Sequence, residues 1–393
     1  MMILIDFLKR YVIKPILSLY GLAISILFPI RKKLIVFWSF NGNQYGGNPR
    51  CISEYIQHHS DQYDIVWLKS RASKTAFPKI VRSLKLHSLT QIYYMNVAEF
   101  LVTDCRTNPA SMSWHKRSQQ KYIMTWHGGM GIKKVEKDAI DTLPANYIKT
   151  AKSDSKIADL FLSGSGFLTK LYRKSFWYDG EILQKGIPMY DLYFDAQKVA
   201  QQNTEIRRIL NIGNDAMIVL YAPTFRSDFS LEPYRIDWNV ISEILSKKYR
   251  KEVFILLKLH PHFLSKQIDT ESLISNRHVI NVTSQGDITS LICASDMLIT
   301  DYSATMFEMA LVKKPVFLYA VDVKEYDRDF YFNFKDLPFA LAESQEELAM
   351  NIESFDPKIY QSNLNRFMQE DIEINETGMA SKAVFEWIKS HSL

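Results

Sequence analysis

Short, almost wholly apolar runs alternate with amphipathic stretches along most of the chain after residue 33. The first runs lie at 34–40, 65–68, 100–103 and 122–126, and each ends in a polar or glycine-bearing segment. The intervening stretches at 49–58 and 132–141 have the residue spacing of helices. Continuous apolar strands that are separated by helices predict a parallel sheet with both faces covered.

A second series of the same kind begins near residue 216. Strands are predicted at 217–222, 253–259, 279–282, 297–300 and 316–319. Helices are predicted at 239–249, 288–294, 305–312 and, at the end of the chain, 380–391. The polar stretch at 195–214 lacks a strand pattern and is interpreted as a linker. We therefore predict an α/β protein of two Rossmann-like lobes that face each other across a cleft, with ligands at the carboxyl ends of the strands.

The first 33 residues combine an uncharged apolar run with basic flanks. The run at 15–30 carries no charge, and residues 31–33 are all basic. At about 1.5 Å per residue the run spans roughly 24 Å, which is short of the ~30 Å hydrocarbon core of a bilayer. A polar or small residue recurs every three to four positions, as Asp6, Arg10, Lys14, Ser18, Gly21 and Ser25.

This pattern predicts a membrane-associating helix over residues 1–33 that lies in the plane of the interface, with its basic flanks near anionic headgroups. A short spanning helix and a helix docked on the protein itself are the two alternatives. We expect a peripheral or monotopic membrane protein, and basic residues on both sides of the run leave its orientation open.

Composition narrows the classes of protein that remain. The 393 residues are 47% hydrophobic, which is ample for two or three packed domains. Forty-eight Lys and Arg against 43 Asp and Glu give a net charge of +5, which is too small for a nucleic-acid partner but suits anionic lipids or phosphate substrates. Cys51, Cys105 and Cys293 have no paired spacing, which disfavours a disulfide framework or a zinc site and favours a reducing compartment.

Two strand-end loops of the first series carry candidate chemistry. The loop at 41–48 (NGNQYGGN) has glycines that permit close approach of the backbone to a ligand, although a simple turn has the same composition. His127 follows the strand at 122–126 among glycines, ahead of Lys133 and Lys134. A histidine in such a place is accessible, and its ordinary pKa of about 6.5 suits proton transfer at neutral pH. A histidine that only satisfies a structural turn is the alternative.

Two loops of the second series add cationic groups. Arg226 closes the sequence YAPTFR after the strand at 217–222, and its planar fork suits phosphate oxygens. His260 stands at the end of the strand at 253–259, where Pro261 stops the strand. His260 and His262 have metal-ligand spacing, but no carboxylate or cysteine cluster accompanies them. We expect His260 to make a catalytic or phosphate contact, and we expect neither a metal nor a cofactor.

The segment after the strand at 297–300 resembles a diphosphate cradle made without a metal. Asp301 opens it, and Ser303 and Thr305 are predicted to cap the following helix, whose free N–H groups attract anions. Glu308 lies one turn further on, where its carboxylate suits the two ribose hydroxyls. A plain helix cap with a solvated glutamate is the alternative. The sequence Asp-Arg-Asp at 327–329 matches the DxD pattern of metal-dependent sugar transferases, but it follows the other motifs and is interpreted as coincidental.

Taken together and in order, these segments resemble the CDP-glycerol glycerophosphotransferase family of teichoic-acid primases and polymerases. The resemblance lies in TWHG at 125–128, YAPTFR at 221–226, KLHP at 258–261, SDMLITDYSATMFE at 295–308 and KKPVFLY at 313–319. It implies a GT-B-like fold, a location on the cytoplasmic face of the cell membrane, a CDP-alditol donor such as CDP-glycerol and a lipid-linked saccharide acceptor. It also implies that His127 and His260 are essential.

From the residues and the resemblance we predict four parts: a membrane helix at 1–33, an acceptor lobe at 34–205, a donor lobe at 206–375 and a terminal helix at 376–393. His127 is the expected base, with Gly128, Lys133 and Lys134 on the acceptor. His260 is expected to be catalytic as well, and the donor is expected to contact a set of side chains in the second lobe, namely Arg226, Asp301, Ser303, Thr305 and Glu308. A GT-B glycosyltransferase that uses a nucleotide sugar and an inactive membrane scaffold are the alternative functions.

Overall fold

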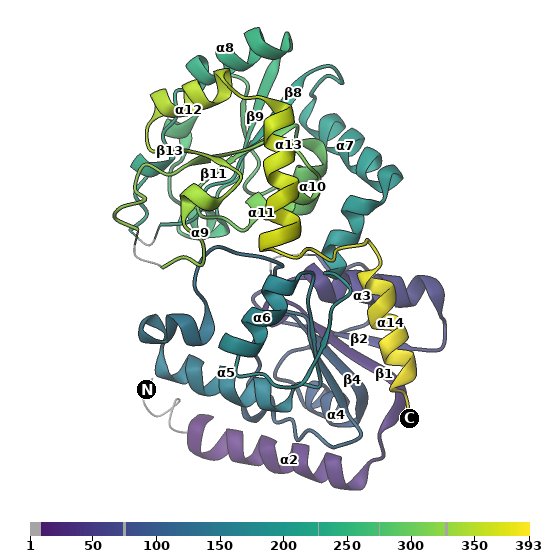
Figure 1. The fold of residues 1–393 in the computed structure, drawn as a ribbon. Coiled ribbons are helices and arrows are strands. Elements are labelled where there is room, and N and C mark those ends of the chain that lie inside the picture. The colour runs from purple at the N-terminus through teal and green to yellow at the C-terminus, as the bar shows by residue number, and fades with distance from the viewer. Residues whose placement is uncertain (1–8, 74–75, 227, 275, 327–328) are drawn as a thin grey trace. The chain divides into compact units, whose positions relative to one another are not determined.

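The computed structural model describes residues 9–73, 76–226, 228–274, 276–326 and 329–393. The chain divides into two compact units (Figure 1). The first unit comprises Met1–Gly129, Val135–Asp191 and Ile374–Leu393. The second unit comprises Met130–Lys134 and Leu192–Glu373. The chain therefore passes between the units more than once, whereas the sequence suggested one crossing near residue 205.

The first unit is built on a parallel sheet of seven strands in the order β3-β2-β1-β4-β5-β6-β7. The strands are β1 (Arg31–Trp38), β2 (Asp64–Lys69), β3 (Ser83–Lys85), β4 (Ala98–Thr103), β5 (Lys121–Met124), β6 (Leu160–Leu162) and β7 (Glu181–Leu183). Val36 of β1 pairs with Val66 on one side and Leu101 on the other. The strand order reverses between β1 and β4, which creates the position where ligands bind in open α/β sheets.

Helices cover this sheet, and one of them comes from the far end of the chain. They are α2 (Lys14–Leu27), α3 (Gly47–His59), α4 (Leu89–Val97), α5 (Ala145–Ile157), α6 (Gly166–Ser175) and α14 (Ala380–Ser390), with shorter turns η1 (Lys9–Ile13), η2 (Phe40–Gly42), η3 (Pro109–Met112), η4 (Glu136–Thr142) and η5 (Pro188–Phe194). Figure 1 shows α14 beside α3, and Phe385 packs edge-on against Tyr55 with ring centroids 6.1 Å apart. The terminal helix is thus part of the first unit's core rather than a separate element.

Helix α2 is docked on the first unit, beside α4 (Figure 1). His115 contacts the Ser18 carbonyl through Nε2 at 2.9 Å, and Arg117 donates to the carbonyl of Ser25 at 2.9 Å. A Cβ on Gly21 would lie 2.1 Å from the backbone oxygen of Ser113, so the close approach requires glycine. The small and polar stripe of this helix therefore faces protein. Within the described residues, no helix is both long and apolar enough to cross a bilayer.

A helix docked on the protein itself was one of the arrangements considered from the sequence, and the structure shows this docking for Lys14–Leu27. Docking explains the pattern of the sequence, because small residues let two helices or a helix and a loop approach closely. The opposite, apolar face of α2 stays exposed, with Leu19 65% and Ile26 72% accessible. Residues 1–8, which belonged to the predicted membrane helix, lie outside the described residues.

The second unit has a parallel sheet of six strands in the order β10-β9-β8-β11-β12-β13. The strands are β8 (Met217–Tyr221), β9 (Val253–Leu257), β10 (Val279–Asn281), β11 (Met297–Thr300), β12 (Val316–Tyr319) and β13 (Ala340–Ala342). The strand order reverses between β8 and β11. The helices are α7 (Ala196–Leu210), α8 (Trp238–Tyr249), α9 (Pro261–Ser265), α10 (Ile288–Ala294), α11 (Thr305–Leu311), α12 (Gln345–Glu353) and α13 (Pro357–Arg366), with η6 (Glu232–Tyr234), η7 (Glu271–Leu273), η8 (Phe334–Asp336) and η9 (Phe367–Asp371).

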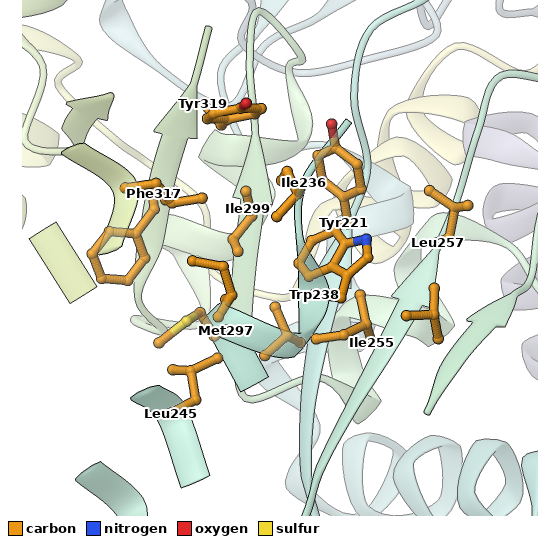
Figure 2. Packing of buried hydrophobic residues seen from close by; sticks show 14 of the residues in the cluster. Tyr221, Ile236, Trp238, Leu245, Ile255, Leu257, Met297, Ile299, Phe317 and Tyr319 are labelled. Carbon is orange, nitrogen blue, oxygen red and sulfur yellow. The ribbon is translucent and has the colours of Figure 1, made fainter. Parts of the chain in front are cut away.

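One face of this sheet carries the core shown in Figure 2. Trp238 at the start of α8 is buried and packs edge-on against Tyr221 at the end of β8, with ring centroids 5.1 Å apart. Met297 and Phe317 extend the cluster across the neighbouring strands β11 and β12. Burial of such large side chains supplies most of the free energy that holds strands in place, at about 25 cal/mol per Å² of apolar surface. The strand ends that carry polar loops are therefore rigidly anchored.

Two predicted elements differ from the structure. Residues 132–141 form a bridge and the 3-10 turn η4 instead of a continuous helix, because Lys133 and Lys134 pair with the segment near Phe330. The predicted linker at 195–214 contains the helix α7, which Asp195 caps at its N-terminus by accepting hydrogen bonds from two backbone amides. Asn211 ends α7 in the left-handed conformation that favours asparagine or glycine.

Candidate functional site

In the first unit, the candidate groups lie on loops at the carboxyl ends of β1, β4 and β5. We call Ser39, Asn48, Asp104 and His127 the first half-site. Ser39 and Asp104 follow β1 and β4 directly, and β1 and β4 are the strands between which the order reverses. His127 lies three residues beyond the end of β5. These residues therefore lie where ligands bind in open α/β sheets, and their chemical role stays a prediction.

His127 is exposed, and its ring is held from one side. Its Nδ1 atom lies 3.1 Å from the backbone carbonyl oxygen of Asp104. The ring centroid lies 4.2 Å from that of Trp126 and 6.4 Å from that of Phe40. Gly128 beside it leaves open space, since a Cβ there would meet nothing within 4 Å. An exposed, oriented imidazole with free space next to it can accept a proton from a substrate hydroxyl.

Asp104 organises the loop opposite His127. Its carboxylate accepts a hydrogen bond from the Phe40 amide at 2.8 Å and a short one from the Ser39 hydroxyl. Burial raises the pKa of the Asp104 carboxyl, and the hydrogen bonds from Ser39 and Phe40 counteract that rise. Gly47 adopts φ +60° next to this carboxylate, where a Cβ would lie 3.1 Å from Oδ2. Gly47 of the 41–48 loop therefore permits close packing against Asp104.

In the second unit, Arg226 lies in a buried ionic network at the ends of β8, β11 and β12. Its guanidinium donates to Asp322 through Nε at 2.6 Å and through Nη2 at 2.9 Å, and Nη1 lies 2.8 Å from Oδ2 of Asp301. Tyr302 also donates its hydroxyl to Asp322 at 2.8 Å. Burial alone lowers the pKa of Arg226, but the hydrogen bonds and charges of Asp322 and Asp301 outweigh burial and raise it.

This placement differs from the open phosphate fork that the sequence suggested. The fork of Arg226 is engaged by two carboxylates, and its side chain is only 8% exposed. Asp301 also accepts a hydrogen bond from the Thr224 amide at 2.8 Å, so Asp301 joins two strand-end loops. A direct contact between Arg226 and phosphate stays a prediction, and the structure shows an organising role.

His260 stands where it was predicted, at the carboxyl end of β9 and at the N-cap of α9. Its Nδ1 accepts a hydrogen bond from the backbone amide of His262 at 3.2 Å, which leaves Nε2 as the nitrogen that can carry a proton toward a ligand. Burial lowers the pKa of His260, and the positive charges of His262 and Lys133 add to that effect. Among the described residues there is no group of three or more His, Cys, Asp or Glu side chains that could hold a metal.

Ser303, Thr305 and Glu308 surround the start of α11. The hydroxyls of Ser303 and Thr305 lie 2.9 Å apart, and the Ser303 hydroxyl accepts from the Thr305 amide at 3.3 Å. The N-cap position itself is Ala304, so the predicted cap is shifted by one residue. Glu308 is buried and accepts a hydrogen bond from the Tyr193 hydroxyl at 2.8 Å. Burial raises the pKa of Glu308 to about 7. The solvated glutamate considered as an alternative is therefore excluded.

Lys133 and Lys134 belong to the second unit, together with the predicted donor residues. Lys133 lies with Nζ 3.4 Å from the Thr224 hydroxyl and 5.3 Å from the ring centroid of Tyr326. Lys134 forms an ion pair with Asp329 at 2.9 Å. The acceptor role of these lysines stays a prediction, but Lys133 shares its surroundings with His260. Of the DxD pattern, positions 327 and 328 lie outside the described residues.

Several of these polar residues were not singled out from the sequence, among them Asn48, Asp104, Tyr193 and Asp322. The strand-end rule identifies Asp104, which directly follows the apolar run at 100–103. Asp322 follows β12 by three residues and is recognisable in the same way. Asn48 lay inside a loop that was noted only for its glycines. Tyr193 has no sequence signal, because only the fold brings it to Glu308.

Two parallel α/β units, each with polar side chains on the loops where its strand order reverses, have the architecture of a GT-B-like enzyme. The chain belongs to the CDP-Glycerol:Poly(glycerophosphate) glycerophosphotransferase family, whose pattern matches residues 21–389. The members of this family are transferases.

The chain is similar to several named relatives. It is 27% identical over 387 residues to a teichoic acid poly(glycerol phosphate) polymerase of Bacillus spizizenii, covering 94% of this chain and 96% of the relative. It is 29% identical over 373 residues to a polymerase of the same name from Staphylococcus epidermidis, covering 91% of this chain and 51% of the relative. The chain thus spans about half the length of the latter.

A solved structure is also similar over nearly the whole chain. It is the wall teichoic acid polymerase TagF, with a TM-score of 0.82 and 27% identity, covering 98% of this chain and 95% of that one. This likeness confirms the two-sheet α/β fold that the sequence predicts.

Proposed function

We propose that the chain transfers an alditol phosphate, with glycerol phosphate as the first candidate, from a CDP-alditol to a hydroxyl of a lipid-linked wall or surface polysaccharide, and releases CMP. The family match over residues 21–389 is the observation that carries this proposal. A Staphylococcus aureus relative is named a teichoic acid glycerol-phosphate transferase. A histidine-to-asparagine variant of the solved polymerase was soaked with CDPG.

The second unit is proposed to hold the donor. Ser303 and Thr305 place two hydroxyls at the start of α11, where they suit diphosphate oxygens. Glu308 lies one turn further along the helix and suits the ribose hydroxyls. We assign Lys133 to the donor instead of the acceptor, because it belongs to the second unit and its Nζ lies 3.4 Å from the Thr224 hydroxyl, on the loop after β8. Lys133 and His260 would together offset the negative charge that builds on the transferring phosphate.

Asp301 and Arg226 are proposed to act on the donor indirectly, by fixing the positions of the loops that contact it. Their ion pair ties the loops after β8 and β11 together at the point of strand reversal. Both side chains are nearly fully buried, at 2% and 8% exposure. Rigid loops at this point keep Thr224 and the α11 start in fixed geometry, which phosphoryl transfer requires because its catalysis is mostly positioning and electrostatics.

His127 is proposed as the general base. The acceptor oxygen attacks the phosphorus that carries the alditol, a new phosphorus–oxygen bond forms, and the bond to the bridging oxygen of CMP breaks. The acceptor proton passes to Nε2 of His127, and CMP leaves as a phosphate anion that needs no protonation. Gly128 leaves room for the acceptor at this position.

Membrane association is proposed to use the exposed face of α2. Large apolar side chains on that face are 40–74% accessible, namely Ile16, Leu19, Leu22, Ile26 and Leu27. The exposed basic residues Lys14 and Lys32 flank them. An apolar face with basic flanks suits an anionic bilayer surface. This would hold a peripheral enzyme on the cytoplasmic face of the membrane, near its lipid-linked acceptor.

The test is an assay of nucleotide release and product mass with a lipid-linked disaccharide acceptor. CDP-glycerol, CDP-ribitol and UDP-sugars are offered in parallel to the wild-type chain. We expect CMP release and an acceptor heavier by one or more alditol phosphates with a CDP donor. UDP release with transfer of a sugar would overturn the proposal in favour of a glycosyltransferase.

The variant His127→Ala tests the proposed role of His127 as the general base. We expect its turnover to fall roughly 100- to 10,000-fold, which is the usual contribution of one general base. The donor KM should change little, because the donor residues lie in the second unit. His59→Ala, an exposed histidine on α3, is the matched control and should keep full turnover. Wild-type turnover by His127→Ala would contradict the proposed base.

A further inference from the structure

The backbone just before His127 is held in an unfavourable conformation. Trp126 has φ +57°, in the left-handed region of backbone conformations that residues other than glycine and asparagine rarely adopt. Such a residue costs about 1–3 kcal/mol and persists only where its surroundings require it. The indole ring packs edge-on against Phe176 with centroids 4.8 Å apart, and the Thr125 amide donates to the Thr103 carbonyl at 2.8 Å. These contacts restrain the Trp126 ring and the residue before it, and the Thr125 hydroxyl lies 3.0 Å from the carbonyl oxygen of Trp126.

Asn48 also holds that carbonyl, and it does so from another segment of the chain. Its Nδ2 donates to the carbonyl oxygen of Trp126 at 2.9 Å and to that of Thr125 at 3.3 Å, and its Oδ1 accepts from the Met189 amide at 3.0 Å. Carbonyl oxygens only accept and a backbone amide only donates, so the orientation of the Asn48 amide is determined. The side chain is fully buried, and it lies at the start of α3. Asn48 therefore ties three chain segments of the first unit to one point.

The conformation of Trp126 decides where the next side chain goes. His127 points its Nδ1 at the Asp104 carbonyl oxygen, 3.1 Å away. Because a carbonyl oxygen cannot donate, Nδ1 must carry the hydrogen, and the lone pair of the neutral ring then lies on Nε2. The Asp104 backbone is itself fixed, since its carboxylate accepts from the Phe40 amide and the Ser39 hydroxyl.

We infer that Asn48 is a positioning residue for His127: it holds the left-handed turn at Trp126 and thereby keeps the His127 ring on the Asp104 carbonyl, with Nε2 available as the base. This inference rests on the proposed role of His127 in catalysis. Asn48 acts through the backbone of residues 125 and 126 and does not itself contact the reacting groups. Its removal should therefore affect turnover more than donor binding.

Two variants separate the effect of the Asn48 hydrogen bonds from the effect of its side-chain volume. Asn48→Asp keeps the shape and the acceptor for the Met189 amide, but it turns the donor toward Trp126 into an oxygen that faces two carbonyl oxygens. Asn48→Ala removes both the donor toward Trp126 and the acceptor for the Met189 amide. Misplacement of a catalytic group by about 1 Å costs on the order of 100-fold in rate. We expect both variants to lose roughly 10- to 100-fold in kcat while the donor KM stays within about twofold.

Ser53→Ala is the matched control for loss of a buried hydrogen bond in the same helix. The Ser53 hydroxyl accepts from the indole N–H of Trp67 at 3.1 Å and does not contact residues 125–127. We expect it to lose stability without a comparable loss of kcat. The thermal midpoint of every variant is measured as well, so that a rate change can be compared with a stability change. Equal kcat losses in Ser53→Ala and the Asn48 variants, at equal loss of midpoint, would indicate a merely structural role and overturn the inference.

The ring tautomer supplies a readout that a structural role would not move. Protein labelled with ¹⁵N-histidine is observed by NMR, and the His127 signals are assigned by their loss in His127→Gln. We expect the Nδ1–H tautomer in the wild type and a mixture of tautomers in Asn48→Asp. Unchanged tautomer and unchanged kcat in both Asn48 variants would overturn the inference.

The double variant His127→Ala with Asn48→Asp tests whether Asn48 affects turnover through His127. If Asn48 acts through His127, adding Asn48→Asp should cause no further loss in the His127→Ala background. If His127→Ala is inactive but Asn48→Asp has normal turnover, the inference fails and the proposed function stands. If His127→Ala has normal turnover, the proposed base fails, and the inference about catalysis fails with it.

Discussion

Tyr193 donates its phenolic hydroxyl to Oε2 of Glu308 over 2.8 Å, inside the second unit. Glu308 is only 7% exposed, so its carboxyl is removed from water and is hydrogen-bonded to the Tyr193 phenol inside the protein. Burial raises the pKa of Glu308 to about 7, and the hydrogen bond from Tyr193 opposes that rise. Glu308, which is predicted to bind the donor, therefore also titrates near neutral pH.

The first prediction concerns stability and pH at Glu308. The carboxyl has an ordinary pKa of 4.5 when unfolded and about 7 when folded, so between these values the folded state keeps a proton that the unfolded state has lost. The contribution of Glu308 to stability is therefore full below pH 4.5 and is lost as the pH rises through 7. Glu308→Gln should remove this dependence. Relative to wild type, its free energy of unfolding should rise by about 3 kcal/mol from low pH to pH 8.

Urea unfolding at a series of pH values checks this prediction. Glu376 has a pKa raised to about 8 by burial and titrates in the same range, so the difference between variant and wild type is the quantity to compare. The control is Glu243→Gln, at an exposed position whose pKa is lowered by its hydrogen bond with Lys247. A difference between Glu308→Gln and wild type that does not change with pH would contradict the burial of an ionisable carboxyl.

The second prediction concerns the ionic network of Arg226. Arg226→Met leaves Asp301 and Asp322 without their cation, and unpaired buried charges are costly. We expect a loss of roughly 3–5 kcal/mol in the free energy of unfolding. Replacing both aspartates by asparagine in the same chain should recover part of that loss, because the uncompensated charges are then removed.

Denaturant titration of the single and triple variants measures both effects. Arg208→Met, which breaks an exposed pair with Glu205 one turn away, is the control and should change the free energy of unfolding far less than Arg226→Met does. The interpretation is wrong if Arg226→Met unfolds like the control. A large rise in donor KM with unchanged stability would instead support the direct phosphate contact that the sequence suggested.

The third prediction concerns the docking of α2. In a free helix, Gly→Ala stabilises by up to about 1 kcal/mol. At Gly21 the added Cβ would meet the Ser113 backbone oxygen at 2.1 Å, so Gly21→Ala should destabilise instead. Hydrogen exchange should show lost protection across Lys14–Leu27, while the core strands stay protected. Leu22→Ala, on the exposed face, serves as the control and should keep the protection. Greater protection in Gly21→Ala would show that the helix does not dock this way.

The fourth prediction concerns the outer face of α2. Replacing Leu19, Leu22 and Ile26 by serine should reduce co-sedimentation with phosphatidylglycerol-containing vesicles at least tenfold, because the apolar surface available for burial is removed. Binding by the wild type should also weaken as salt is raised, since the basic flanks are screened.

A triple serine variant on the second unit provides the matched comparison. Ile209, Met350 and Ile359 are similarly exposed, at 53%, 57% and 62%, but they lie far from α2 in the sequence. Their replacement should leave vesicle binding intact. If both triple variants bind vesicles like the wild type, then α2 is not the membrane contact.

The sequence predicted strands well because their apolar runs are continuous, as at 297–300, where the prediction and β11 coincide. It missed short strands such as β3 and β13, whose three residues carry too little pattern. The loop at 132–141 appeared helical by periodicity. Its residues instead pair with a segment near Phe330, almost 200 positions away, and that partner leaves no mark on the local pattern.

By itself, the amino-acid sequence determined the two parallel α/β units and the placement of His127, His260 and the α11 start at strand ends, because apolar runs and the polar loops after them are local features. Only the tertiary structure decided what those side chains contact. Arg226 is neutralised by Asp322, Glu308 meets Tyr193, and the polar stripe of α2 faces protein. These partners come from distant segments, and burial decides their protonation and pairing, so a local pattern cannot contain them.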